Sequence, residues 1–219
     1  MINFTIGTDH PIIISNGNVH LDGILHIPEG ATSLVLFVHG SGSSRFSIRN
    51  QYVARVFNEG KLATLLFDLF TPEEDAIDTR TRELRFDIEF LASRLINATD
   101  WCMKQLVTHN FNIGYFGAST GGGAALVAAA KEKSVVKAVV SRGGRPDLAG
   151  ESLTQVKAPT LLIVGGNDEV VIEMNQTAMS KMHCITKLAI ISGATHLFEE
   201  SGTLEEVARL AKAWFVQYI

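Results

Sequence analysis

The sequence predicts an α/β fold built on a doubly wound, mostly parallel β-sheet with helices on both faces. Short apolar runs of strand length alternate with longer helical segments along the 219-residue chain, which is the order of elements in a parallel sheet joined by crossover helices. Most of these runs are apolar at nearly every position, as strands buried on both faces are. Apolar residues make up 46% of the chain and charged residues 19%, the balance of a globular protein with a large core.

The strands are expected in two groups. Residues 19–28 (VHLDGILHIP) alternate apolar and polar side chains, which is typical of an antiparallel strand with one buried face. The parallel strands are expected at residues 33–40, 62–68, 111–117, 136–144, 159–166 and 186–192. No cap or inserted domain is expected, because the connection between residues 143 and 160 has room only for a short helix near residues 148–154.

The helices between these strands are indicated by apolar periodicity and by flanking glycines. They are expected at residues 48–59, 80–108, 120–132, 170–182 and 203–218. Residues 80–108 are interpreted as one long segment, in which Arg85 and Glu89 form a favourable i,i+4 pair. Thr203 followed by Glu206 predicts a capping box at the start of the last helix.

Length, charge and cysteine count narrow the class of protein. The chain is expected to form a single α/β domain over residues 1–219. Its formal charge of -4, with no block of Lys or Arg, predicts neither a nucleic-acid nor a membrane partner. The N-terminal stretch MINFTIGTDH lacks the pattern of a signal peptide, and two cysteines, Cys102 and Cys184, predict no disulfide framework. We therefore expect a cytoplasmic protein that acts on a small molecule. Both a monomer and a homodimer are compatible with the sequence.

Ligands of an open parallel sheet bind beyond the carboxyl ends of its strands. The segments that follow the expected strands are therefore the candidates for chemistry. Three of them supply a serine, an aspartate and a histidine in that chain order: GASTGGG (117–123), GGNDEVV (165–171) and SGATHLFEE (192–200). These side chains, Ser119, Asp168 and His196, are the candidates for a catalytic triad.

Ser119 lies within a G-x-S-x-G pattern, between an apolar strand and an alanine-rich helix. This is the setting of a nucleophile elbow, a turn so tight that both neighbours of the serine must be small. The turn also places the serine at a helix N-terminus, where free N–H groups and the helix dipole favour an oxyanion. The alternative is a glycine loop that binds phosphate, but GASTGGG lacks the lysine of a P-loop.

Asp168 and His196 follow the next strands in the order that this kind of triad requires. Asp168 is expected to hold His196 in the correct tautomer, with Glu169 as a competitor and a simple helix cap as the alternative role. The other histidines are expected away from the chemistry: His10, His20 and His26 in the N-terminal antiparallel region, His109 and His183 at the opposite sheet edge, and His39 in a structural role.

Two further features bear on the site. The glycine loop HGSGSSR (39–45) is expected to provide one oxyanion donor, the N–H of Ser41, while the N–H of Thr120 provides the second. A non-catalytic anion-binding turn is the alternative for this loop. Arg45, Arg142 and Arg145 are candidates to clamp a substrate carboxylate or phosphate, or else they pair with nearby carboxylates of the chain.

The segments HGSGSS, GASTGG, GGND and GATH make the chain resemble the α/β-hydrolase superfamily, and within it the small dienelactone-hydrolase-like proteins, over nearly its whole length. The resemblance implies an eight-stranded, mostly parallel sheet without a cap domain, a triad at Ser119, Asp168 and His196, and no metal or organic cofactor. Dienelactone hydrolases proper carry cysteine at the elbow, where this chain has Ser119. The departure favours a serine esterase over an enzyme for a true dienelactone.

The predicted activity is hydrolysis of a small ester through an acyl-enzyme formed on Ser119. An acyltransferase or a C–C hydrolase with the same triad is the alternative within enzymes. A non-catalytic binding module of the same fold is the alternative outside them.

Overall fold

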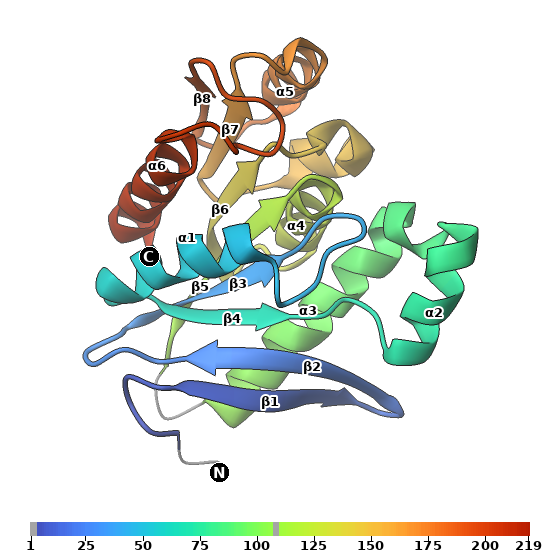
Figure 1. Ribbon diagram of the computed structural model, residues 1–219, viewed down its shortest axis with the longest axis vertical. Helices are drawn as coiled ribbons and strands as arrows, with labels where there is room; N and C mark the ends of the chain where they lie inside the picture. The colour runs from blue at the N-terminus through green and yellow to red at the C-terminus, as the bar shows by residue number, and fades with distance from the viewer. Residues whose placement is uncertain (1–3, 107–109) are drawn as a thin grey trace.

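The computed structural model describes residues 4–106 and 110–219 and contains an eight-stranded sheet. The strands are β1 (Asp9–Asn16), β2 (Val19–His26), β3 (Ser33–Val38), β4 (Ala63–Phe67), β5 (Asn112–Ala118), β6 (Val136–Arg142), β7 (Thr160–Gly165) and β8 (Thr186–Ile191). They lie in the order β1-β2-β4-β3-β5-β6-β7-β8 (Figure 1). The β1–β2 and β2–β4 pairs are antiparallel and the other five are parallel. The expected mostly parallel sheet of eight strands is confirmed.

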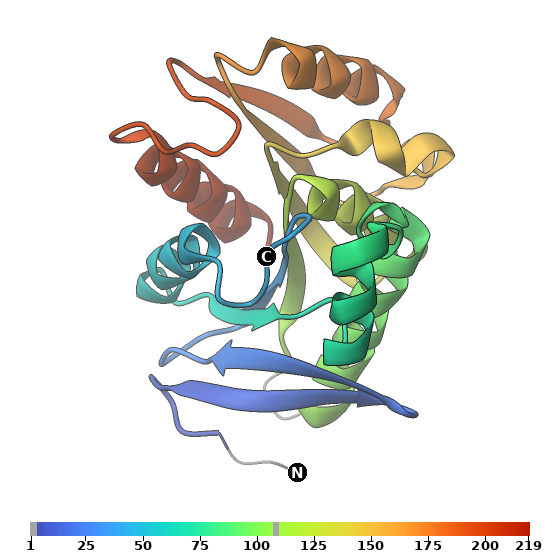
Figure 2. The same cartoon turned by 45° about the vertical axis from the view of Figure 1, so that its right-hand side comes forward.

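The helices cover both faces of this sheet. They are α1 (Ile48–Glu59), α2 (Pro72–Thr81), η1 (Leu84–Phe86), α3 (Ile88–Gln105), α4 (Thr120–Lys131), η2 (Pro146–Gln155), α5 (Glu169–Lys181) and α6 (Thr203–Tyr218). Helices α1 and α6 lie on one face, while α3, α4 and α5 lie on the other, and Figure 2 shows the sheet between them. Within the ranges that the structure describes, no helix combines the length and the apolar character needed to cross a membrane.

The sheet is buried on both faces because its central strands carry apolar side chains at successive positions. On β5, Tyr115 belongs to the core beneath α3 and α4, and its hydroxyl lies 2.8 Å from the hydroxyl of Thr99 on α3. The next residue, Phe116, belongs to the opposite core, where its ring centroid lies 4.9 Å from that of Phe37. Strand β5 thus separates two apolar cores and is held from both sides.

The parallel strands end level with one another at the edge where the candidate residues lie. Val38 at the end of β3 pairs with Gly117, and Ala118 at the end of β5 pairs with Arg142. Arg142 in turn pairs with Ile163 on β7. This register brings the segments that follow β3, β5, β6 and β7 to one edge of the sheet.

The expectation of one long helical segment over residues 80–108 is wrong. Helix α2 ends at Thr81, a single 3-10 turn follows, and α3 starts after Asp87, whose Oδ1 accepts a hydrogen bond from the N–H of Phe90 at 2.9 Å. Arg85 pairs with Asp78 of α2 at 2.6 Å and not with Glu89. The residue that caps the end of α2 is Arg82, whose backbone is left-handed with φ 60°, and Asp87 caps the start of α3.

The capping box expected at Thr203 and Glu206 is also wrong. Gly202, with φ 80°, is the N-cap residue of α6, and the hydroxyl of Thr203 donates to the carbonyl of Glu200 at 2.7 Å. Glu206 binds Arg209 instead. Because a positive φ is freely accessible only to glycine, the position of Gly202 decides where this helix begins.

Candidate active site

Ser119 forms a strained turn between β5 and α4. Its backbone has φ 51° and ψ -123°, a conformation that a non-glycine residue adopts at a cost of about 1–3 kcal/mol. The turn is held by backbone hydrogen bonds: the N–H of Ser119 donates to the carbonyl of Arg142 at 3.2 Å, and its carbonyl accepts from the N–H groups of Gly122 at 2.9 Å and Arg145 at 3.0 Å. The end of β6, the segment that follows it and the first turn of α4 therefore hold the backbone of Ser119 in this conformation.

Glycines on either side make this turn possible. A Cβ atom on Gly117 would lie 2.4 Å from the carbonyl oxygen of Gly121, and one on Gly121 would lie 2.2 Å from the carbonyl oxygen of Val38. Both distances are far below van der Waals contact, so neither position accepts a side chain without a backbone shift. The G-x-S-x-G pattern reflects this close approach of β5, α4 and the end of β3.

His196 and Asp168 form a hydrogen-bonded pair at the same edge of the sheet. His196 Nδ1 lies 2.6 Å from Asp168 Oδ2, and the two side chains are 39% and 17% exposed. The Asp168 side chain does not cap α5, which begins at the next residue. The alternative role of Asp168 as a simple helix cap is therefore not observed.

Ser119 and His196 are linked through the end of β6. Gly143 follows Arg142, whose carbonyl binds the N–H of Ser119, and a Cβ on Gly143 would lie 3.5 Å from His196 Cε1. Within the described ranges, the hydroxyl of Ser119 makes no hydrogen bond. Hydrogen bonds between catalytic groups are often long without substrate and tighten when it binds.

The loop after β3 passes beside the elbow. A Cβ on Gly40 would lie 3.0 Å from Ser119 Cβ, and the hydroxyl of Ser41 lies 3.2 Å from that of Thr120. Thr120 is the first residue of α4, where the backbone N–H has no partner within the helix. Ser41 and Thr120, expected as the two oxyanion donors, thus lie next to one another and next to Ser119.

His39 connects this loop to the segment after β4 through two hydrogen bonds of its ring. The N–H of Leu69, after β4, donates to His39 Nε2 at 3.1 Å, so the ring proton is on Nδ1, which donates to the carbonyl of Gly40 at 3.0 Å. Burial lowers the pKa of His39, and this effect outweighs the hydrogen bond to Gly40 and the charges of Asp68 and Asp75. His39 is therefore neutral and ties the loop to β4. His109, expected at the opposite edge, lies outside the described residues.

The arginines differ in whether they are already paired. Arg145 binds Asp147 through two hydrogen bonds of 2.9 and 2.7 Å, and Arg45 binds both Asp68 and Asp22. Arg142 is only 8% exposed, and the one hydrogen bond that its guanidinium makes to a described residue, from Nη2 to Asn50 Oδ1, is long at 3.4 Å. Its Nε and Nη1 atoms are buried with no partner in the part of the chain that is described.

The electrostatic state of Arg142 is unusual as well. Burial, together with the charge of nearby Arg49, lowers the pKa of Arg142 to about 10, so it stays charged at neutral pH. A buried guanidinium without a carboxylate is rare, because arginine is seldom buried unless paired. Of the three candidate arginines, Arg142 is the one whose guanidinium has no carboxylate partner among the described residues.

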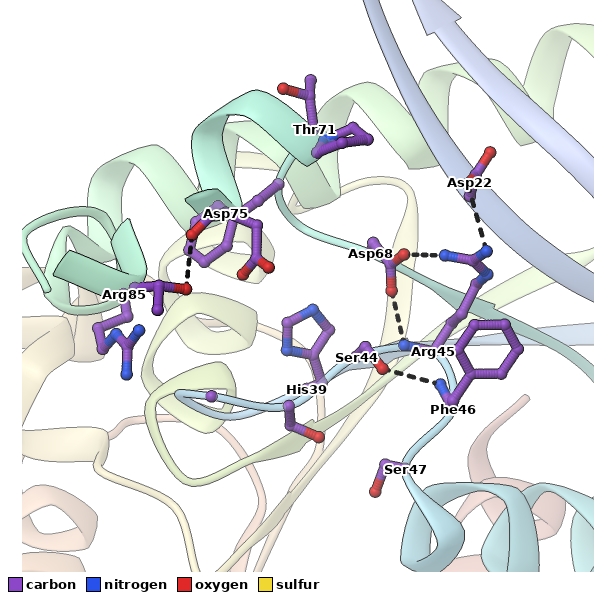
Figure 3. A pocket seen from close by; sticks show the side chains of 15 residues that line it. Asp22, His39, Ser44, Arg45, Phe46, Ser47, Asp68, Thr71, Asp75 and Arg85 are labelled. Carbon is purple, nitrogen blue, oxygen red and sulfur yellow. Dashed lines mark hydrogen bonds and ion pairs between the residues drawn. The ribbon is translucent and has the colours of Figure 1, made fainter. Parts of the chain in front are cut away.

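A cavity of about 650 Å³ lies beside the elbow, between the loop after β3 and helix α2 (Figure 3). Its walls are mostly polar and charged. The lining residues are Asp22, His39, Gly42, Ser43, Ser44, Arg45, Phe46, Ser47, Asp68, Phe70, Thr71, Pro72, Asp75, Thr79 and Arg85. Ser119 and His196 do not line it, but it begins one residue after Ser41, whose hydroxyl donates to the carbonyl of Arg85 at 3.4 Å.

The sequence does not predict this cavity, because one of its walls, α2, lacks an apolar periodicity. The available signal was the capping box Thr71–Glu74 with Pro72 between them. The hydroxyl of Thr71 accepts from the N–H of Glu74 at 3.3 Å, and Glu74 Oε2 accepts from the N–H of Thr71 at 2.9 Å. For metals, no group of three or more His, Cys, Asp or Glu side chains suited to an ion occurs among the described residues.

Comparisons with known proteins agree with this arrangement. Residues 21–217 match the model of the dienelactone hydrolase family. The chain is similar to a crystal structure of dienelactone hydrolase from Anabaena variabilis, with 58% identity, a TM-score of 0.95 and coverage of 97% of this chain and 98% of that one. Est1E from Butyrivibrio proteoclasticus shares the fold, with a TM-score of 0.79 at 18% identity over 94% of this chain and 98% of Est1E.

A curated relative is longer than this chain. The Mycobacterium tuberculosis protein named "Putative phosphoribosyl transferase" is 56% identical over 211 residues, which cover 96% of this chain and 47% of the relative. The chain thus spans about half the length of the curated relatives that it matches.

Proposed function

Because this chain belongs to the dienelactone hydrolase family, we propose that it is a serine hydrolase that cleaves small carboxylic esters through a Ser119–His196–Asp168 triad. The observation that carries the proposal is the 2.6 Å pair of His196 and Asp168 at the sheet edge where Ser119 occupies a strained elbow. The chemistry needs a nucleophile, a base and an acid that orients the base, and these three side chains supply those roles.

In this mechanism, Ser119 Oγ attacks the ester carbonyl while His196 Nε2 accepts the hydroxyl proton. The carbonyl oxygen becomes an oxyanion, which the N–H groups of Ser41 and Thr120 stabilise. The imidazolium of His196, held by Asp168 through Nδ1, returns the proton to the leaving alcohol and leaves an acyl-serine. Water then attacks the acyl group, His196 again takes and returns a proton, and the acid leaves.

A fluorophosphonate probe tests this proposal directly, since it reacts with activated serines. We expect labelling of the wild-type protein at Ser119, found by peptide mass spectrometry, and none in Ser119→Ala. The wild type should also hydrolyse short p-nitrophenyl esters, and Ser119→Ala should not. Absence of both labelling and turnover in a folded wild-type protein would contradict the hydrolase and favour a binding module.

Two other activities use the same groups. An acyltransferase or a C–C hydrolase would also form an intermediate on Ser119, and partition of the product between water and added alcohol separates transfer from hydrolysis. The phosphoribosyl transferase name belongs to a protein about twice as long as the matched region. The arrangement of Ser119, His196 and Asp168 supports ester hydrolysis independently of that name.

We further propose that Arg142 recognises an anionic group on the substrate, while Arg45 and Arg145 have structural roles. The support is that Arg45 and Arg145 are paired with carboxylates and Arg142 is not. In Arg142→Gln, the ratio of kcat/KM for a hemisuccinate ester to that for the neutral butyrate ester should fall at least about tenfold. An unchanged ratio, in a variant with normal circular dichroism, would contradict this role.

A further inference from the structure

The 650 Å³ cavity beside Ser41 has no role in the mechanism above, although it opens next to the proposed oxyanion donors. We infer that it binds the alcohol part of the substrate and that this part is rich in hydroxyl groups, as in an ester of a sugar or a polyol. The inference rests on the proposed function and names its substrate class.

The charges of the cavity argue against an anionic occupant. Three carboxylates, from Asp22, Asp68 and Asp75, and two guanidinium groups, from Arg45 and Arg85, line the cavity. Both Asp22 and Asp68 bind Arg45, and His39 is neutral because burial lowers its pKa. The formal charge of the walls is therefore negative, and a phosphate or carboxylate would meet net repulsion.

The free hydrogen-bonding groups fit hydroxyls. The Asp75 carboxylate has no hydrogen bond or ion pair to any described residue, and Figure 3 shows it on the side of the cavity that faces His39. Arg85 uses Nε and Nη2 to hold Asp78, so its Nη1, near Gly42, keeps donors to spare. A hydroxyl both donates and accepts, so a polyol can bind the acceptor on Asp75 and the donor on Arg85 together.

The remaining walls suit a compact, polar ligand more than an alkyl chain. Five of the lining residues carry small hydroxyl side chains, namely Ser43, Ser44, Ser47, Thr71 and Thr79. Two rings, Phe46 and Phe70, supply the apolar surface, and Phe46 is 57% exposed. Apolar rings combined with a few oriented polar groups are the usual design of a small-molecule site.

The wall that carries Asp75 is held in place. Glu74 binds Arg94 of α3, and Asp78, on the last turn of α2, binds Arg85 at 2.6 Å. Asp78 is fully buried, so this anchor is protected from solvent. The anchors keep Asp75 at a constant position across the cavity from the loop that carries Ser41, as recognition of a defined ligand requires.

Paired esters of one acid test this inference. For wild type, we expect kcat/KM for 1-glyceryl butyrate and for a glucosyl butyrate to exceed that for n-propyl butyrate by at least about tenfold. In Asp75→Asn and in Ser43→Ala, the polyol-to-propyl ratio should fall several-fold. The control Asp100→Asn makes the same change at an exposed site on α3, outside the cavity, and should keep the wild-type ratio.

The outcomes separate this inference from the proposed function. Turnover of propyl butyrate with Ser119 labelling, but no preference for either polyol ester, would overturn the subsite and leave the hydrolase intact. A preference for choline butyrate over both polyol esters would also overturn it, because the Asp75 side would then select a cation. If no ester is cleaved, titration of Ser119→Ala with methyl glucoside and glycerol still decides: binding that Asp75→Asn weakens supports the subsite, and no binding overturns it.

Discussion

At the scale of single residues, the site depends on a constrained backbone at Ser119 and on neighbouring glycines that have no room for a side chain. Ser119 has a positive φ of 51°, and this conformation is held by its backbone hydrogen bonds with Gly122, Arg142 and Arg145. Such strain persists only where the surroundings hold it, and it commonly marks a functional position. Two features of the site can be tested by single substitutions: the close packing of Gly121 and the hydrogen bond between Asp168 and His196.

Gly121→Ala should unfold or strongly destabilise the elbow. The new Cβ would lie 2.2 Å from the carbonyl oxygen of Val38, and a backbone atom at the end of β3 cannot rotate away. We expect a loss of about 3 kcal/mol or more in the free energy of unfolding, measured by urea denaturation. In the control Gly30→Ala the new atom has nothing within 4 Å, and the positive φ of Gly30, 74°, should cost only about 1–2 kcal/mol. Equal losses would show that the close approach is unimportant.

Asp168→Asn should lower kcat by about 10⁴-fold without unfolding the protein. The amide cannot hold the Nδ1–H tautomer of His196 as the carboxylate does at 2.6 Å. Glu169→Gln is a matched control, since Glu169 is the neighbouring exposed carboxylate at the start of α5. It should change kcat less than twofold. A larger effect at Glu169 than at Asp168 would reassign the acid of the triad.

At the scale of elements, α2 differs from the other helices because charge, not apolar packing, holds it. Asp78 is its only buried residue among those described. Burial by itself would raise the pKa of Asp78, but the hydrogen bonds and charge of Arg85 outweigh this and lower it. Since the pair is largely removed from solvent, loss of one partner leaves a buried group without compensation.

Asp78→Asn should therefore release α2 locally. We expect amide hydrogen exchange over residues 72–86 to accelerate at least tenfold, while exchange in β5 and α4 stays unchanged. Glu206→Gln, which breaks the exposed pair between Glu206 and Arg209 on α6, is the control. It should cost less than about 1 kcal/mol, as surface pairs do. If both variants exchange like the wild type, α2 is held by something other than its ion pairs.

How far the sequence predicts these elements depends on their apolar pattern. The helices at residues 48–59 and 203–218 begin and end where expected, because each has an apolar face against the sheet. Helix α2 has no such face, so periodicity could not find it, although Thr71, Pro72 and Glu74 signal its start. Periodicity does not predict the break between α2 and α3, because it depends on the left-handed backbone of Arg82 and on the helix cap at Asp87.

The candidate site was predictable in its parts but not in its geometry. The order of Ser119, Asp168 and His196 after successive strands is visible in the sequence, because parallel strands all end at one edge. The distinction between paired Arg145 and unpaired Arg142 depends on side-chain positions that no local pattern encodes. The cavity is formed by the chain after β3, the chain after β4, and α2, so it exists only in the folded protein.

At the scale of the whole molecule, the two apolar cores pack against opposite faces of the sheet, and the central strands of that sheet end at the candidate site. His39, at the end of β3, connects the glycine loop to β4 by its hydrogen bond from Leu69. Its carbonyl also lies 2.6 Å from where a Cβ on Gly121 would be, so it forms part of the floor under the elbow. A change in the charge of His39 therefore acts on strand pairing and on the site together.

Stability should fall as the pH drops below about 6.5, and His39 should cause much of the change. Burial lowers its pKa in the folded protein, whereas the unfolded chain binds a proton near the ordinary value of about 6.5. Below that pH the unfolded state binds more protons than the folded state, so the free energy of unfolding decreases, by at most about 1.4 kcal/mol per pH unit from this one group. Urea denaturation of the wild type at pH 8, 6 and 5 measures the slope.

His39→Gln should be less stable at pH 8 but show a shallower decline in the free energy of unfolding between pH 6 and 5, while His20→Gln, at an exposed position, should keep the wild-type slope. Parallel slopes for the wild type and His39→Gln would mean that His39 is not the group that titrates.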